Sequence, residues 1–580
     1  MARPEHLHLQ ASFDLIIVGA GAAGCVLAAR LSEAEHKRVL LIEAGPDAKP
    51  GREHPHILDS FPATYGNPRF FWTNLTAESG ADPGDGRGRV STPYLQPFGV
   101  GGGSNVNGMA ADRCQPSDYD EWCALGAEAW AWKDVLPYFR RLEHDLDFTG
   151  DLHGIDGPMP VRRVSQKDWA PFAKAVAHAF VRRGAALVDD SNGNFSDGVS
   201  PVPMNCLADR RVSASMAYLT ADVRNRRNLT ILDNTKAERL SIRSGRICGV
   251  QVQTPHELRS FGASEVIVSC GAVFSPVLLL RSGIGPVEHL RAIGIDVVCD
   301  LPGVGRNLQN HPWVPVVTHL RRTATQPANQ RAWQQNQVRY SSGRSDCAQS
   351  DMSILVFNKS GWHSLGRRIA TLGVELLKPY STGYVELRSR HADVSPNVCF
   401  NLLEDSRDFE RMVDGVLIAL DVLAQEDVRQ LHNGPFVPNL ALEERLAFPN
   451  IRNTITAFVL SIALQLGPLR RAALAKRLLK AGSASDREVA VRDYVRVMAQ
   501  AIYHPSGSCR MGNARDSRTV VDPHCRVLGI RGLRVVDASI FPTVPRGQTH
   551  FPVLMVAEKM ADVIKADWRL EATTKCVDKK

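Results

Sequence analysis

The stretch "FDLIIVGAGAAGCVLAARLSEAEHKRVLLIEAGP" (residues 13–46) decides the fold of this 580-residue chain. Residues 15–18 are an apolar run typical of a buried strand, residues 22–31 have helical character, and residues 39–42 are a second apolar run that ends in Glu43. A strand, a glycine-rich turn, a helix and a second strand that ends in an acid predict a Rossmann-type dinucleotide-binding unit. A plain glycine-rich turn would leave Glu43 unexplained.

Each glycine of this motif has its own expected role. Gly19 makes the tight turn, Gly21 lets the backbone approach a pyrophosphate, and Gly24 lets the helix pack closely on the strand. The start of the helix offers oriented amides and partial positive charge to the phosphates. We expect Glu43 to accept hydrogen bonds from the adenosine ribose, which disfavours the 2′-phosphate of NADP.

Composition excludes several classes of protein. Hydrophobic residues make up 44% of the chain and charged residues 22%, as in soluble globular proteins. The net charge of +8 is not gathered in a basic stripe, and no nucleic-acid-reading motif accompanies it, so we expect no nucleic acid partner. The 12 cysteines occur singly, without CxxC or metal-ligand spacing. Free thiols, no metal ion and a reducing compartment follow as expectations.

The sequence also predicts a location. No apolar run resembling a secretory signal occurs near residue 1, and the longest apolar stretch, residues 455–466, is shorter than the ~20 residues that cross a membrane. We therefore expect a cytoplasmic protein. A segment that ends at residue 482 follows this stretch, and it contains Arg470, Arg471, Lys476, Arg477 and Lys480. Two interpretations of residues 455–482 stay open, a packed cover or subunit contact and a peripheral contact with a membrane.

Further blocks of the sequence resemble the glucose/methanol/choline (GMC) family of FAD-dependent oxidoreductases, including its choline and alcohol dehydrogenases, and they occur in that family's order. The blocks are "GVGGGSNVNGM" (99–109), "DYDEW" (118–122), "VIVSCGAVFSPVLLLRSGIGP" (266–286), "LPGVGRNLQNH" (301–311), "YHPSGSCRMG" (503–512) and "LRVVDASIFPTVPRGQTHFPVLMVAEKMADVI" (533–564). This resemblance covers nearly the whole chain.

The resemblance implies an α/β fold, α+β overall. A Rossmann-type FAD-binding domain would be interleaved with a substrate domain built on an antiparallel sheet with covering helices. The FAD-binding domain is expected to comprise residues 1–154, 226–315 and 501–568, the last with the catalytic residues; the substrate domain 155–225 and 316–500; and a tail 569–580. Residues 228–240 alternate in polarity like a single strand.

The same resemblance implies where FAD binds. The loop of glycines at 101–103 has almost no side-chain bulk and would lie against the flavin ring, and Asp537 would contact the ribityl or pyrophosphate region. The expected cofactor-binding residues are Gly19, Gly21, Ala22, Ala23, Gly24, Glu43, Ala44, Gly102, Ser104, Asn107, Gly108, Met109, Ala237, Gly271, Asp537, Ala538 and Thr549.

Departures from the family pattern include one three-residue segment and two single positions. Residues 96–98 are Gln-Pro-Phe where Arg-Gly-Lys is usual, and Asn310 replaces a common aspartate. Val106 stands where some members carry a histidine bonded covalently to FAD. Since valine has no nucleophilic nitrogen, we expect non-covalent FAD.

Oxidation of an alcohol by flavin needs a base for the hydroxyl proton and a firm hold on the C–H bond. His504 matches the histidine on which the family relies. The family's second group, a histidine or asparagine that binds the substrate oxygen, falls without gaps on Gln548, whose amide can donate but cannot take a proton. A shift of the alignment would bring His550 to the flavin instead, and this alternative stays open.

The function expected is FAD-dependent oxidation of a primary alcohol to the aldehyde. A small-molecule alcohol would be the substrate, and a quinone or dioxygen the electron acceptor. Two alternatives remain: a non-redox lyase that retains FAD, and an FAD-binding protein whose catalysis has decayed, motivated by Gln548 and residues 96–98.

Overall fold

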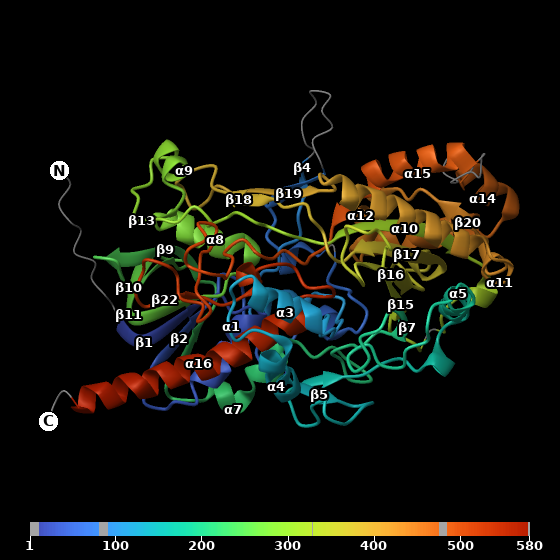
Figure 1. The fold of residues 1–580 in the computed structure, drawn as a ribbon. Helices are drawn as coiled ribbons and strands as arrows, with labels where there is room; N and C mark the ends of the chain where they lie inside the picture. The colour runs from blue at the N-terminus through green and yellow to red at the C-terminus, as the bar shows by residue number, and fades with distance from the viewer. Residues whose placement is uncertain (1–10, 66, 81–90, 328, 475–483, 578–580) are drawn as a thin grey trace.

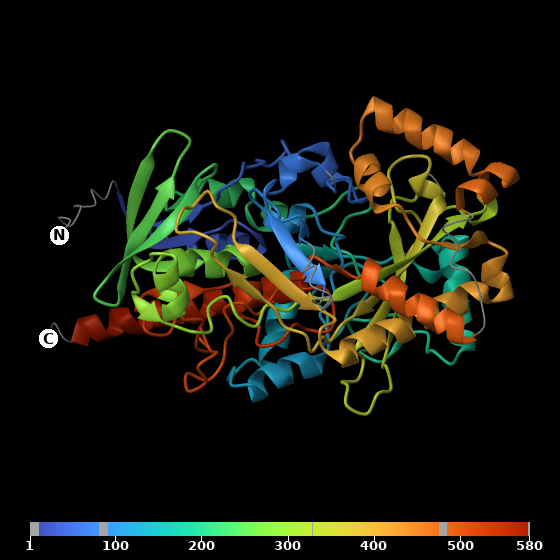
Figure 2. The same cartoon turned by 90° about the horizontal axis from the view of Figure 1, so that it is seen from above.

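The computed structural model describes residues 11–65, 67–80, 91–327, 329–474 and 484–577, and Figure 1 shows their arrangement. Two large sheets lie at opposite ends of an elongated molecule, as Figure 2 shows from above. A long helix, α16 (His550–Val577), runs beneath the first sheet and contacts α1 (Ala22–Leu31).

The first sheet has seven strands and contains the dinucleotide motif. Its order is β8-β2-β1-β11-β10-β9, with β22 beside β11. The strands are β1 (Ala11–Val18), β2 (Val39–Ile42), β8 (Leu229–Leu232), β9 (Lys236–Arg243), β10 (Arg246–Gln253), β11 (Leu258–Val268) and β22 (Leu533–Val535). β1 is parallel to both neighbours, with Leu15 opposite Val39 and Ile16 opposite Val266. Its last four residues are almost fully buried, as expected for an interior parallel strand.

Residues 228–240, expected as one strand, form two. β8 pairs with β2 at one edge of the sheet, and β9 pairs with β10 at the other. Between them Asn234 has a positive φ of 47°, which breaks the extended conformation. The alternation in polarity was real, but a local pattern does not reveal that the chain crosses the sheet between the two strands.

The second large sheet is antiparallel. Its order is β20-β14-β17-β16-β15-β7, with β21 beside β14. The strands are β7 (Gly198–Pro201), β14 (Pro312–Leu320), β15 (Gln334–Tyr340), β16 (Met352–Phe357), β17 (Ile369–Leu376), β20 (His432–Phe436) and β21 (Gln500–Ala501). Helices α5 (Pro171–Arg182) and α10 (Ser406–Ala424) pack on it, and α15 (Ala484–Met498) packs on α10.

A four-stranded sheet lies between the two large ones in Figure 1. It joins β18 (Tyr384–Glu386) and β19 (Asn397–Leu402) to β3 (Thr76–Gly80) and β4 (Ser91–Pro93). Two further pairs are β5 (Glu143–Asp145) with β6 (Met159–Val161), and β12 (Ile284–Gly285) with β13 (Cys299–Asp300). β3 and β19 fall in different expected domains although they pair in one sheet. The domain limits expected from the sequence stay a prediction.

The remaining α-helices connect and cover these sheets. They are α2 (Pro55–Leu58), α3 (Pro116–Ala124), α4 (Trp132–Leu142), α6 (Ala214–Tyr218), α7 (Ala221–Arg224), α8 (Gly271–Arg281), α9 (Val287–Ala292), α11 (Glu426–Arg429), α12 (Leu440–Ala447), α13 (Ile451–Ala463) and α14 (Gly467–Leu474). Among the described residues, the search for a helix long and apolar enough to cross a membrane found none.

Candidate active site

A cavity of about 470 Å³ lies at the carboxyl ends of β1, β2 and β11. This edge of a parallel sheet is where dinucleotides bind, and the volume lies in the usual range for cofactor sites. Of the expected cofactor-binding residues, those that line it are Gly19, Gly21, Ala22, Ala23, Glu43, Ala44, Gly102, Ala237, Gly271, Asp537 and Ala538. The others, which are not among its lining residues, are Gly24, Ser104, Asn107, Gly108, Met109 and Thr549.

The glycines of the motif have the geometry that a dinucleotide site needs. Gly19 has a φ of 99°, in the left-handed region that favours glycine. A Cβ on Gly24 would lie 2.0 Å from the carbonyl oxygen of Gly19, so only glycine allows this helix to pack here. A Cβ on Gly21 would meet nothing closer than 4.0 Å, so space remains beside this backbone for a phosphate group. These residues therefore fit the FAD that the family resemblance implies.

Two buried acids frame the cavity. Glu43 accepts hydrogen bonds from the amides of Ala20 at 2.9 Å, Gly45 at 2.9 Å and Gly99 at 3.2 Å. Asp537 accepts from the amides of Gly271 and Ser539 and from the Ser275 hydroxyl. Burial raises the pKa of both carboxyls, and these hydrogen bonds oppose the rise. Each acid thus holds cavity-lining backbone in place, a role that the sequence did not predict.

The glycine-rich loop is anchored by a buried arginine. Nη1 of Arg211 donates to the carbonyl oxygen of Asn107 at 2.7 Å and to its side-chain oxygen at 2.6 Å, and Nε donates to the carbonyl oxygen of Ile57 at 3.0 Å. Gly102 itself packs against the backbone of Gly21, where a Cβ would lie 2.8 Å from the neighbouring Cα. The side chain of Val106 is buried against apolar neighbours.

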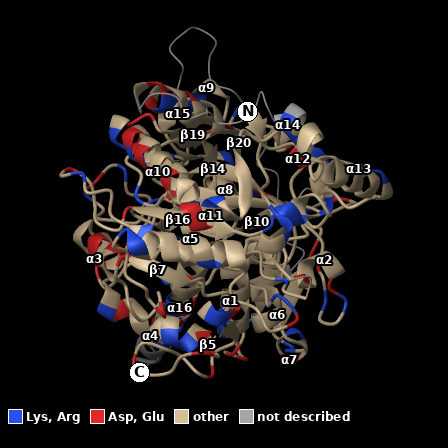
Figure 3. Ribbon diagram, turned by 90° about the vertical axis from the view of Figure 1, so that its right-hand side faces the viewer, with Lys and Arg blue, Asp and Glu red and all other residues tan. Residues whose placement is uncertain are grey.

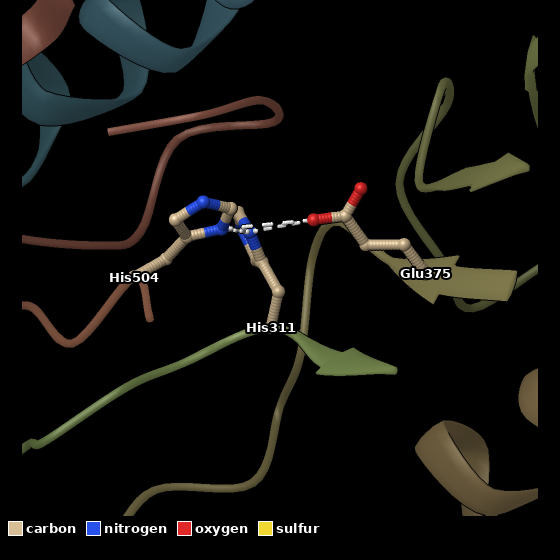
Figure 4. A group of neighbouring side chains, drawn as sticks. All are labelled: His311, Glu375 and His504. Carbon is tan, nitrogen blue, oxygen red and sulfur yellow. Dashed lines mark hydrogen bonds and ion pairs between the residues drawn. The ribbon is translucent and has the colours of Figure 1, made fainter. Parts of the chain in front are cut away.

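His504 lies in the turn between β21 and β22 and contacts two groups that the sequence did not single out. Its Nδ1 is 3.0 Å from Nδ1 of His311 and 3.6 Å from Oε1 of Glu375, and Figure 4 shows these three side chains. The Asn310 side chain accepts a hydrogen bond from the backbone amide of His504 at 3.2 Å. Burial lowers the pKa of His504 to about 3; His311 adds to this effect and Glu375 opposes it. His504 is therefore neutral at ordinary pH.

Residues 309–311 join the His504 turn to the chain segment before α16. Gln309 and Ser506 pair through backbone hydrogen bonds of 2.9 Å in each direction. The side chain of Gln309 accepts from the amide of Val544 at 2.8 Å, and Nε2 of His311 is 3.1 Å from the carbonyl oxygen of Pro545. The same turn reaches the cavity wall, because the amide of Gly507 donates to the carbonyl oxygen of Ala538.

Gln548 and His550 lie at the start of α16. Both are largely enclosed, and Oε1 of Gln548 and Nε2 of His550 are buried without a hydrogen-bond partner among the described residues. Burial, with Arg211 nearby, lowers the pKa of His550 to about 3. The next turn of α16 reaches the cavity through Val553, whose amide donates to Thr549. Neither Gln548 nor His550 is among the residues that line the cavity. Two orphaned polar atoms one helical turn before Val553 are what a bound ligand would satisfy.

Sequence reasoning missed Glu375, His311 and Arg211. Glu375 had a detectable signal, because it is the only charged residue in the apolar run "IATLGVEL" of β17, and a buried charge needs a partner. His311 ends a block that carried the family resemblance, yet nothing local assigned it a role. The two histidines and Glu375 have the spacing of metal ligands, as do Glu143, Asp145 and His153. In the first group a hydrogen bond joins the two histidines, and Oε1 of Glu375 lies 3.4 and 3.6 Å from them. The expectation of no metal stays a prediction.

Comparison with known proteins gives consistent matches over the chain. Models described as GMC oxidoreductase match residues 13–313 and 379–557. The 5-(hydroxymethyl)furfural oxidase of Methylovorus sp. (strain MP688) is 38% identical, over 95% of this chain and 98% of its own. The mitochondrial choline dehydrogenase of Homo sapiens is 33% identical, over 95% of this chain and 90% of its own.

Two more relatives complete the comparison. The oxygen-dependent choline dehydrogenase of Sinorhizobium fredii is 31% identical, over 95% of both chains. Among solved structures, pyridoxine 4-oxidase of "Mesorbium loti" superposes with a TM-score of 0.78 at 26% identity, covering 95% of this chain and 98% of its own.

Proposed function

This chain belongs to the GMC oxidoreductase family, and we propose that it oxidises aromatic or heteroaromatic primary alcohols to aldehydes with His504 as the base. It is an FAD-dependent oxidoreductase that acts on CH–OH donors. Bound FAD would accept the hydride, while the protein's own residues hold the alcohol and take its hydroxyl proton.

The observation that carries this proposal is the state of His504. Its side chain is only 14% exposed and its pKa lies near 3. Gly507, three residues further along the same turn, donates a backbone hydrogen bond to Ala538 in the wall of the cavity that fits FAD. A neutral imidazole with one free nitrogen can remove a hydroxyl proton. Within the described part of the chain, Nε2 of His504 makes no hydrogen bond, and Figure 4 shows it directed away from His311.

Gln548 is proposed to hold the substrate oxygen. Its side-chain amide can donate to an alcohol or alkoxide oxygen, and its buried Oε1 has no partner among the described residues. His550 remains the alternative, because its Nε2 is equally buried and unpartnered.

A chain of aromatic rings supports the aromatic substrate class. Tyr503, next to His504, lies 5.9 Å from Tyr65 between ring centroids. Tyr65 is 6.5 Å from Trp333, which in turn contacts Phe61 and Phe357 at 5.8 and 4.7 Å. The Trp333 ring also lies 3.4 Å from where a Cβ of Gly108 would be. Aromatic rings thus extend from the loop at Gly108 to the turn that carries His504. Edge or offset stacking on these rings would orient a flat substrate.

Such rings also accept quaternary ammonium groups, so the test must include choline. Anaerobic mixing with furfuryl alcohol, benzyl alcohol and choline distinguishes aromatic alcohols from choline as substrates, because oxidation of a substrate bleaches the flavin absorbance. We expect the first two to bleach it and choline to react at least ~10-fold more slowly. Bleaching by choline alone would overturn the aromatic assignment, and an unchanged spectrum with all three would overturn the proposed oxidation of these alcohols. Peroxide measured in air then distinguishes dioxygen from a quinone acceptor.

The FAD is proposed to be non-covalent. Val106, at the position of the covalent attachment seen in some members, is packed among Ile57, Phe70 and Phe71 and offers no nucleophile. Acid precipitation of the protein should therefore release the flavin into the supernatant. Yellow colour that stays with the pellet would contradict this.

We propose, in addition, that α13 docks on an anionic membrane surface. One side of this helix packs on the second sheet through Ala457, Leu460 and Leu464. The opposite side is exposed, and its apolar residues continue into α14 at helical spacing: Ile451, Ile455, Phe458, Val459, Ile462, Leu466 and Leu469. Figure 3 shows α13 projecting at the edge of the molecule.

Charge favours an anionic partner for this surface. The sequence from 450 to 485 contains no acidic residue, and its basic ones are Arg452, Arg470, Arg471, Lys476, Arg477 and Lys480. Residues 475–483 lie outside the described residues, so the docking surface consists here of α13 and α14. An exposed apolar stripe flanked by basic residues suits the interface of an anionic bilayer.

Sedimentation with vesicles tests the docking surface. We expect the holoenzyme to sediment with phosphatidylglycerol vesicles, and the double variant Ile455→Ser/Phe458→Ser to remain in solution. Leu258→Ser, which changes an apolar residue of similar exposure on β11, is the control and should still sediment. Equal sedimentation of wild type with and without vesicles would refute membrane docking, and loss of a dimer in the double variant would assign the surface to a second copy.

A further inference from the structure

Two buried side chains from distant parts of the sequence meet the proposed base, His504. His311 precedes β14, Glu375 lies in β17, and His504 lies in the turn after β21 (Figure 4). His311 and Glu375 have fully buried side chains, and that of His504 is 14% exposed. The two rings are nearly perpendicular, at 80°, with Nδ1 facing Nδ1 at 3.0 Å.

When both rings are neutral, the hydrogen bonds fix which nitrogen carries each proton. Nε2 of His311 lies 3.1 Å from the carbonyl oxygen of Pro545, and a carbonyl oxygen can only accept, so this Nε2 carries a hydrogen. A neutral His311 then has a bare Nδ1, which can only accept from His504. Nδ1 of a neutral His504 must therefore carry the hydrogen, which leaves its Nε2 bare.

From this geometry we infer that His311 and Glu375 are positioning residues that hold His504 in the tautomer with Nδ1–H and a free Nε2. The inference rests on the proposed role of His504 as the base. It names the two residues that leave Nε2 of this base free to accept a proton. With Nε2 protonated instead, His504 would have no lone pair to offer the alcohol. The carbonyl oxygen of Pro545, three residues before Gln548, thereby sets the tautomer of His504 through two successive hydrogen bonds. The first joins Pro545 to His311, and the second joins His311 to His504.

Glu375 has a separate part in the same arrangement. Its Oε2 accepts from the Ser353 hydroxyl at 2.9 Å, whereas Oε1 has no hydrogen-bond partner among the described residues. Oε1 lies 3.4 Å from Nδ1 of His311 and 3.6 Å from Nδ1 of His504. A buried, unpaired carboxylate oxygen at this distance stabilises positive charge on either ring.

The proton can be followed through one turnover. The O–H bond of the alcohol breaks, and its proton forms an N–H bond at Nε2 of His504. The hydride leaves the adjacent carbon, the C–O bond becomes the C=O bond of the aldehyde, and bound FAD would supply the acceptor for the hydride. His504 is then a cation with both nitrogens protonated, and its Nδ1–H remains bonded to His311. The charge of Glu375 offsets this cation until the proton is released with the electrons to the acceptor.

Nitrogen NMR of the oxidised holoenzyme tests the tautomer without any turnover. With ¹⁵N-histidine labelling and His504→Ala to assign the signal, we expect the shifts of neutral His504 to show a protonated Nδ1 and a bare Nε2 at pH 7. The opposite tautomer, or a cationic His311, would overturn the inference. Because no substrate is present, this outcome is independent of whether His504 is the base.

Kinetics test the charge of Glu375. In Glu375→Gln we expect kcat to fall about 10- to 100-fold with KM changed less than ~3-fold, since the group acts on the base and does not touch the substrate. Glu375→Asp keeps the charge and should recover kcat to within ~10-fold of wild type. Asp351→Asn, on a buried acid paired with Arg411, is the matched control and should lower stability with little change in kcat. Equal kcat in Glu375→Gln and wild type would refute the role.

Discussion

His504 is the residue at which the environment determines the chemistry. Burial holds its pKa near 3, so the imidazole is neutral, while its Nδ1 is engaged by His311. We expect His504→Ala to lower kcat by ~10² to 10⁴ with little change in KM and with FAD retained, because only proton removal is lost. His524→Ala, on an exposed turn, is the control. Stopped-flow reduction of the flavin is the measurement, and a rate within ~3-fold of wild type would exclude His504 as the base.

Two variants distinguish Gln548 from His550 as the residue that binds the substrate oxygen. If Gln548 binds the substrate oxygen, Gln548→Ala should raise the barrier by about 1–3 kcal/mol, a ~5- to 150-fold loss in kcat/KM, and His550→Ala should cost less. Gln548→Asn, which keeps the amide, should recover part of the loss. The reverse order, with His550→Ala the more damaging, would transfer the role to His550.

At the scale of elements, the turn from β1 into α1 shows why local sequence predicted this part so well. The limits expected for the helix and second strand, 22–31 and 39–42, are those observed. The role of Gly24 follows from a clash with Gly19, five residues away, which a local motif encodes, whereas a Cβ on Gly19 would clash with the distant Ser269. Residues 228–240 fared less well, because they form two strands where one was expected. Their limits depend on distant partners.

Two glycine variants separate packing from cofactor binding in this turn. Gly24→Ala would place a Cβ 2.0 Å from Gly19 O, so we expect a loss of thermal stability together with FAD. Gly21→Ala would meet no atom closer than 4.0 Å, so the apoprotein should keep its melting temperature while FAD binds more weakly. Apoprotein melting and flavin titration measure the two effects. Equal FAD affinity in Gly21→Ala and wild type would place the pyrophosphate elsewhere.

At the scale of the whole molecule, buried neutral histidines make stability depend on pH. Burial lowers the pKa of His504 and His550 to about 3 and that of His319 and His363 to about 4, below the ordinary 6.5. In the unfolded chain these groups take up protons as the pH falls below 6.5, whereas in the folded protein they do not. The folded state is therefore destabilised from pH 6.5 downward, by up to about 2 kcal/mol per histidine at pH 5.

His153 acts in the opposite sense, because its acid partners raise its pKa to about 10 against the effect of burial. Its stabilising contribution is fully present below pH 6.5 and is lost as the pH rises toward 10, so it cannot offset the further loss between pH 6.5 and 5. We expect the free energy of unfolding in urea to be lower at pH 5 than at pH 7, and the difference to shrink in His319→Phe. Burial also raises the pKa of Asp112 to about 6 and that of Glu443 to about 7, and these acids stabilise the folded state as the pH falls over the same range. The comparison with His319→Phe isolates the histidine, so an unchanged difference between pH 7 and pH 5 in that variant would contradict the burial of His319 in the neutral state.

The sequence by itself determined the dinucleotide motif, the family and the candidates His504, Gln548 and His550, because each rests on residues close together in the chain. Only the tertiary structure brought His311 and Glu375 to His504. The antiparallel register of β14 and β17 sets Trp313 opposite Glu375, and His311, two residues before Trp313, lies diagonally across the same face. A carboxylate at position 375 becomes a partner of the base only when this register forms, and no local pattern encodes the pairing of strands so far apart.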